Sequence, residues 1–286
     1  MKNSLFLGLL LSLCFTTTVA AQDAEATLTE SETFGDNFSL EGALEMFKTS
    51  ESLEEFEAKL NDESNSVNNL DLNEDGDVDY IRVVDNIGEN GTDHAIVLQV
   101  PINENESQDI AVIAIEKVAD EDAMLQIIGD ELLYGEDHIV EPFEAEGEMD
   151  GKGPSAEMGF RVIRVNVWTW RPVRFIYGPR YVRYVSPWRW NYYPRAWHPW
   201  RPVSVVTFRP RVVRYRSPYR VTTTRRVVRA HNVYRPHRRS SAVVVSRRTV
   251  RTGRGVKTTT RVRTNRNGKV NTARRTTVKR RRRGGN

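Results

Sequence analysis

Three stretches decide the fold: VDYIRVVDN at residues 78–86, DHAIVLQVP at 93–101 and QDIAVIAIEKV at 108–118. Each is rich in valine and isoleucine, and the polar connections NIGENGT and INENESQ separate them. Apolar, β-branched runs of this length, bounded by turn residues, are typical of neighbouring antiparallel strands. We therefore expect a meander, and residues 123–141 predict one or two further strands with turns at Gly129 and Gly135.

The stretch before these strands follows a helical period. In SLEGALEMFKTSESLEEFEAKL, residues 39–60, apolar side chains recur at spacings of three and four, which predicts two short amphipathic helices. Ser50 or Ser52 would cap the second helix, with Glu54 and Glu55 in its first turn. The sequence thus predicts a small α+β domain over residues 39–145, in which two N-terminal helices cover one face of a small antiparallel sheet.

A loop rich in carboxylates, DLNEDGDVD at residues 71–79, joins the helices to the strands. It matches the EF-hand pattern at most positions, but Arg82 stands where a bidentate glutamate would close that loop. The loop resembles the DxNxDGxxD loops that lie between β-strands in repeat and adhesion proteins. The resemblance implies one calcium ion, held by the side chains of Asp71, Asn73, Asp75 and Asp79 and by the carbonyl of Asp77.

The missing glutamate removes two ligands, so we expect a weak calcium site, with a dissociation constant of about 10⁻⁴ to 10⁻³ M. The alternative is a polar turn in which the aspartate and asparagine side chains only cap backbone amides. His94 and His138 have no partner at metal-ligand spacing, and we expect each to be a surface or packed residue.

Charge is strongly segregated along the chain. All 38 acidic residues precede position 158, whereas 36 of the 42 basic residues follow it. Such asymmetry predicts either that the basic half meets a polyanion or that the two halves meet each other.

The first 21 residues have the pattern of a secretory signal peptide, with one lysine, an apolar run and small residues ending at Ala21. We expect residues 22–38 to form a flexible N-terminus. We also expect no transmembrane helix in the mature chain. Cleavage after Ala21 removes Cys14, the sole cysteine, which excludes disulfides and thiolate metal sites. The expected location is the periplasm or the cell surface.

The basic half begins after a predicted linker at residues 146–160. Prolines punctuate residues 161–220 every seven or eight positions, and all six tryptophans lie between Trp168 and Trp200. This composition is compatible with an extended structure docked on a surface or with disorder. Arginine interleaved with aromatic rings suits stacking and phosphate or carboxylate recognition. Residues 221–286, which lack apolar periodicity, are expected to be disordered.

As a whole, the chain resembles an uncharacterised family of exported bacterial proteins that combine LDLNEDGDVDYIRV and LQIIGDELLYG with a segment like SPWRWNYYPRAWHPWRP. The resemblance implies compartment and domain plan only. Our leading hypothesis is a non-enzymatic calcium-binding protein whose basic aromatic tail binds lipopolysaccharide, acidic polysaccharide or extracellular DNA. The alternative is a self-assembling structural protein in which the acidic domain of one copy pairs with the tail of another, and a hydrolase is a more distant third.

Overall fold

The computed structural model describes residues 33–135, 138–146, 161–247, 250–252, 256–264 and 270–278. The predicted signal peptide and nearly all of the predicted linker lie outside these residues. Within the described part, no helix combines the length and apolar character needed to cross a membrane.

Two helices form where the apolar period predicts them. They are α1 (Leu40–Thr49) and α2 (Leu53–Leu60). The hydroxyl of Ser39 accepts a hydrogen bond from the Gly42 amide and caps α1. Ser52, rather than Ser50, caps α2 by accepting from the Glu55 amide at 3.2 Å. Both caps satisfy amides that a helix start leaves without an internal partner.

The sheet is the predicted antiparallel meander. Its strands follow chain order as β1 (Arg82–Ile87), β2 (Asp93–Pro101), β3 (Ser107–Ala119), β4 (Asp122–Gly129), β5 (His138–Glu146) and β6 (Arg161–Arg164). A short helix, α3 (Glu131–Tyr134), connects β4 to β5, and Gly135 ends it with a positive φ. The expected α+β class, helices first and meander second, is confirmed.

Strand β1 is shorter than its apolar sequence predicts, because residues 78–81 do not pair with a neighbouring strand. The Val78 amide donates to the carbonyl of Trp200, and the Ile81 amide donates to the side chain of Asn61. These four residues are buried as an extended connection whose polar groups are satisfied outside the sheet. Buried apolar residues therefore continue beyond the strand itself.

The basic segment, residues 161–247, is folded onto the acidic half of the chain. Its elements after β6 are η3 (Val167–Thr169), α4 (Arg171–Ile176), α5 (Val205–Val212), η4 (Val213–Tyr215), β7 (Tyr219–Thr222), α6 (Val228–Tyr234), η5 (Arg235–His237) and α7 (Ala242–Arg247). Of the two possibilities that the sequence leaves open for residues 161–220, docking on a surface is the one observed.

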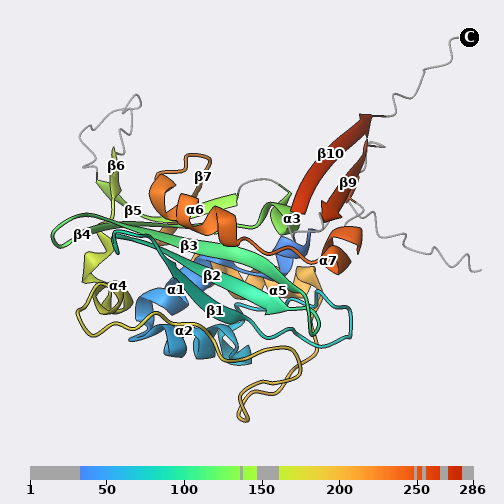
Figure 1. The fold of residues 1–286 in the computed structure, drawn as a ribbon, viewed down its shortest axis with the longest axis horizontal. Coiled ribbons are helices and arrows are strands. Elements are labelled where there is room, and N and C mark those ends of the chain that lie inside the picture. Colours follow the sequence, from blue (N-terminus) through green and yellow to red (C-terminus); the bar gives the residue numbers. More distant parts are fainter. Residues whose placement is uncertain are drawn as a thin grey trace, which may run out of the picture.

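The expectation of disorder is wrong for residues 221–245. Strand β7 pairs with β5, α6 packs on the sheet, and Val244 and Val245 are buried. The sequence lacks apolar periodicity here because each element is short and buries only one or two side chains. Farther on, the backbone forms β8 (Val250–Thr252), β9 (Val256–Thr264) and β10 (Val270–Val278), and the β9–β10 ribbon projects from the body in Figure 1.

The N-terminal boundary also differs from expectation. Residues 33–38, expected to be flexible, form η1 (Phe34–Asn37) and a bridge from Phe38 to Asn68. Gly35 lies against the ring of Tyr134, so closely that an added Cβ would come within 2.5 Å of it.

Helices cover both faces of the sheet. Figure 1 shows α1 and α2 below the sheet and α6 above it. The larger core joins α1, α2 and one sheet face with apolar residues of the basic segment, among them Trp170, Phe208 and Tyr215. The smaller core joins the other sheet face with α6. The basic segment therefore supplies part of both cores.

The basic segment also pairs with both edges of the sheet. Along β1, the Asp85 amide donates to the carbonyl of Tyr184, and the Ser186 amide donates to the carbonyl of Val83. Along β5, strand β7 is an antiparallel partner. An open sheet edge presents unpaired backbone N–H and C=O groups. Pairing with the basic segment gives such groups partners at both edges and protects the sheet from pairing with other chains.

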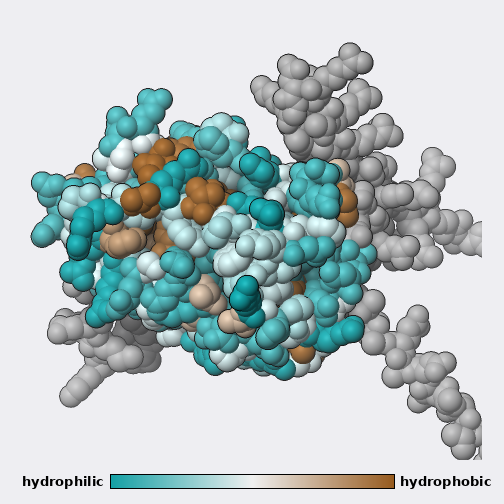
Figure 2. Space-filling view, turned by 60° about the horizontal axis from the view of Figure 1, so that its bottom comes forward, coloured by the Kyte–Doolittle hydropathy of each residue, from teal (hydrophilic) through white to brown (hydrophobic). Residues whose placement is uncertain are grey.

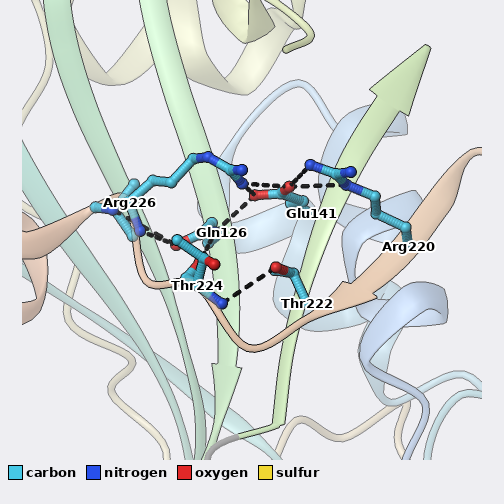
Figure 3. A network of polar contacts seen from close by, with 7 residues as sticks. Gln126, Glu141, Arg220, Thr222, Thr224 and Arg226 are labelled. Carbon is cyan, nitrogen blue, oxygen red and sulfur yellow. Dashed lines mark hydrogen bonds and ion pairs between the residues drawn. The ribbon is translucent and has the colours of Figure 1, made fainter. Parts of the chain in front are cut away.

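Buried carboxylates fix the basic segment in place, as at Glu141 on β5 (Figure 3). Glu141 accepts hydrogen bonds from Arg220, Arg226 and Gln126, the Arg220 Nε donating at 2.9 Å. Gln126 in turn accepts from the Arg226 amide and donates to the carbonyl of Thr224. Asp130 is held in the same way by Arg238, at 2.7 Å. The two halves of the segregated charge pattern thus meet within one chain.

Truncating a core side chain of the basic segment should destabilise the whole domain. Phe208 is 2% exposed, so we expect Phe208→Ala to lower the free energy of unfolding by about 3–5 kcal/mol. Phe175, 44% exposed on α4, is the matched control, and Phe175→Ala should cost less than about 1 kcal/mol. Urea unfolding measures both. Equal small effects would mean that the basic segment adds little to the core.

Candidate functional site

The acidic loop 71–79 is a closed turn between buried anchors. The Asp79 amide donates to the carbonyl of Leu70 at 2.7 Å, and Asn68 donates to the carbonyl of Asp79. Leu70 and Leu72 are buried in the main core. Residues 68–70, directly before the loop, therefore bond to its last residue and close the turn.

Within the loop, the predicted ligand residues bond to the backbone. Asp71 accepts from the amides of Gly76 and Asp75, at 3.1 and 3.2 Å, and Asn73 accepts from the Asp75 amide at 2.9 Å. Asp75 accepts from the amide of Asp77, also at 2.9 Å. Across the described ranges, no three histidine, cysteine, aspartate or glutamate side chains form a ready-made metal site. The oxygens are close together but do not converge on one point.

Asp79 differs from the other loop carboxylates because it is buried. It is 8% exposed and accepts a hydrogen bond from the Leu72 amide at 2.5 Å. Its pKa is raised to about 8, mainly by burial and in smaller part by the negative charges of Asp71 and Asp75. Burial also raises the pKa of Asp71. A cation among these carboxylates would relieve both the mutual repulsion and the cost of burial, so the donor chemistry of the loop fits calcium.

The turn itself depends on Gly76, whose φ is +88°, a conformation that other residues rarely adopt. A Cβ at this position would lie 3.2 Å from the guanidinium of Arg201. The same arginine lies 3.7 Å from the Asp77 carboxylate and is largely exposed. The basic segment thus reaches the acidic loop with one surface arginine.

An aromatic cleft of about 540 Å³ lies beside the loop. The basic segment forms one wall with Tyr184, Trp188, Trp197 and Trp200, while α2 and the residues after it form the other with Glu54, Glu57, Asp62 and Glu63. The ring of Tyr80, directly after Asp79 in sequence, packs edge-on against Trp197 at 5.1 Å. The hydrogen bond from Val78 to Trp200 connects the loop to the cleft.

Glu57, on α2, connects the residue that follows the loop, the basic segment and β1. Its carboxylate accepts from Tyr80 and from Ser186, both at 2.9 Å, and from the Val83 amide at 2.6 Å. Burial raises the pKa of Glu57 to about 7. The sequence alone does not single out this residue, because only its contact with the folded basic segment distinguishes it from the other glutamates of α2. Chemically, the cleft offers flat aromatic faces and carboxylate acceptors, which suit a hydroxylated or cationic ligand.

The two histidines are packed as expected. His94 is buried, with its Nδ1 2.9 Å from Asp85, and lies edge-on to Tyr177 and Tyr181. His138 stacks on Tyr134.

Comparisons with protein-family models, with curated proteins and with solved structures find no match. The class of the protein is therefore defined by its own geometry: an acidic α+β meander domain completed by a basic aromatic segment.

Calcium and protons should compete for the loop. The folded-state pKa of Asp79 is raised, so its contribution to stability is full below its unfolded pKa and is lost as pH rises towards 8. We expect millimolar calcium to raise the free energy of unfolding by about 1–3 kcal/mol at alkaline pH. The gain should be much smaller near pH 5.5, where Asp79 is protonated. Thermal melting with calcium and with chelator measures both values.

Two substitutions separate a bound ion from general screening. Asp79→Asn should abolish the calcium-dependent shift and flatten the pH dependence, whereas Glu89→Gln, at an exposed turn, should leave both unchanged. Asp71→Ala and Asp75→Ala test the other ligand positions. A calcium shift that survives in all three loop variants would show that the loop is not the site.

Proposed function

We propose that the chain is a non-enzymatic, calcium-binding interaction protein of the periplasm or cell surface, which binds anionic polymers through its basic aromatic segment. Calcium would be held by the side chains of Asp71, Asn73, Asp75 and Asp79 and the carbonyl of Asp77. The polymers that suit the segment are lipopolysaccharide, acidic polysaccharide and extracellular DNA.

The surplus of arginine that remains after internal pairing carries this proposal. Several arginines of the basic segment are exposed and make no ion pair within the described residues: Arg174, Arg180, Arg195, Arg211, Arg216 and Arg235. Figure 2 brings the α2 side forward and shows a largely hydrophilic surface with small apolar patches. Such a surface favours a charged, hydrated partner over an apolar one.

Another exposed arginine of the basic segment, Arg189, lies beside aromatic rings. The guanidinium of Arg189 lies 4.9 Å from the centre of the Tyr192 ring, in a turn where Asn191 has a positive φ. Trp188 packs against Tyr192 in the same turn, and Tyr192 is 54% exposed. Exposed rings and guanidinium planes can stack on sugar or base faces, which adds affinity to charge attraction.

Pairing between copies is less well supported. The arginines that face the buried carboxylates do so within one chain, so a second copy would have to displace them. An assembly of acidic domains with the tails of other copies would therefore require exchange of the whole basic segment.

Binding to a polyanion should fall steeply with salt. Dextran sulfate is a suitable probe, and neutral dextran is its matched control. We expect the logarithm of the association constant to decrease linearly with the logarithm of salt concentration, because bound counterions are released. Replacing these six arginines with glutamine should make the slope shallower. Replacing them with lysine should preserve the slope and should lower the affinity only where a guanidinium makes bidentate hydrogen bonds or stacks on a ring. Equal binding to both dextrans at physiological salt would refute the proposal.

A further inference from the structure

A second cavity, of about 420 Å³, lies on the α6 side of the sheet at the β1 edge. Three distant parts of the chain meet there: β1 and β2, the strap 183–185 along the β1 edge, and the turn 236–239 after α6. Val97, Gln99 and Asn86 are buried at its floor, whereas the side chains of the turn are exposed at its rim. The cavity is therefore open to solvent but has an enclosed base.

The lining of this cavity contains four arginines and a histidine but no carboxylate: Arg82, Arg183, Arg238, Arg239 and His237. Elsewhere in the basic segment, Arg220, Arg226 and Arg229 face the buried carboxylates of Glu141 and Glu116. Here only Arg238 makes an ion pair among the described residues, with Asp130. Arg183 is held by neutral oxygens, donating to the Asp85 carbonyl at 2.6 Å and to the Asn86 side chain at 2.9 Å.

Arg82 is the least satisfied of the group. Its Nε is buried and has no hydrogen-bond partner in the described part of the chain. Burial lowers the pKa of Arg82, and the neighbouring positive charge of Arg239 lowers it further. The negative charges of Glu57 and Asp109 act in the opposite direction, but the pKa of Arg82 stays lowered because burial is the largest effect. A buried donor without a partner and repelled by a like charge is costly unless an anion joins it.

Backbone contacts hold the walls of the cavity in place, and they do not involve the guanidinium of Arg239. The Arg239 amide donates to Asp109 at 2.8 Å, and the Arg239 carbonyl accepts from the Asp109 amide at 3.1 Å. The strap is fixed by its pairing with β1. The cationic groups are thus brought together by contacts that leave the Arg239 side chain free to bind a ligand.

We propose that this cavity binds a phosphate group carried by a small or polymeric ligand. Guanidinium forks match the geometry of phosphate oxygens, and the volume lies within the range of small-molecule sites, leaving room for the moiety that bears the phosphate. The inference rests on the proposed function, because it assigns a site and a chemistry to part of the anionic partner.

The chain without the predicted signal peptide, residues 22–286, can be titrated with inorganic phosphate, with polyphosphate and with phosphatidylglycerol vesicles, using phosphatidylcholine vesicles as the control surface. We expect Arg82→Gln to weaken phosphate binding at least about tenfold, as for a lost charged hydrogen bond. Arg239→Gln should do the same and tests the proposal without disturbing a buried residue. Arg171→Gln, an exposed arginine of α4 that pairs with Glu51 and does not line the cavity, should have little effect.

The outcomes separate this inference from the proposed function. Undetectable phosphate binding, or equal weakening by Arg239→Gln and Arg171→Gln, would overturn the cavity as a phosphate site. Dextran sulfate binding that persists in that case would leave the proposed function standing. Loss of phosphate binding in Arg239→Gln would support the cavity as the phosphate site. Whether this variant loses more affinity for polyphosphate or for the phosphatidylglycerol vesicles then identifies the source of the phosphate.

Discussion

The structure depends on one constraint, the need to satisfy carboxylates that the acidic sheet buries. Among the described residues, eight acidic residues are less than a tenth exposed: Glu57, Asp79, Asp85, Asp93, Asp109, Glu116, Asp130 and Glu141. All but Asp79 accept a hydrogen bond or form an ion pair with residues 181–239. A buried carboxylate without a partner costs several kcal/mol, so the acidic half is incomplete without the basic segment.

This pairing gives the segregated charge pattern a structural meaning and leaves two places where the charges do not cancel. At the loop around Asp79, carboxylates gather and, among the described residues, only the exposed Arg201 forms an ion pair with one of them. At the cavity around Arg82, arginines gather without a lining carboxylate. Both exceptions suit a ligand of opposite charge, a cation in the first and a phosphate in the second. The calcium and phosphate proposals follow from these two local imbalances, whereas the proposal of polymer binding follows from the surplus of exposed arginines.

The sequence predicts the acidic half well because its signals are local. Apolar period, caps and valine-rich runs define α1, α2 and the meander, and the spacing of Asp71 to Asp79 defines a loop. The contribution of the basic segment is not local: Glu57 meets Ser186, and Glu141 meets Arg220, across long stretches of chain. Short elements that bury one or two residues, such as β7 and α6, carry no period that a pattern could detect. The phosphate cavity is invisible for the same reason, since three segments contribute to it.

The central claim is that the acidic half and the basic segment form one cooperative unit within a single chain. All six tryptophans lie in the basic segment, so their fluorescence reports on it, whereas far-ultraviolet circular dichroism is dominated by the sheet and helices. Urea unfolding followed by both signals should give coincident transitions, with a midpoint independent of protein concentration. A tryptophan transition well before the loss of secondary structure, or a midpoint that rises with concentration, would contradict this account.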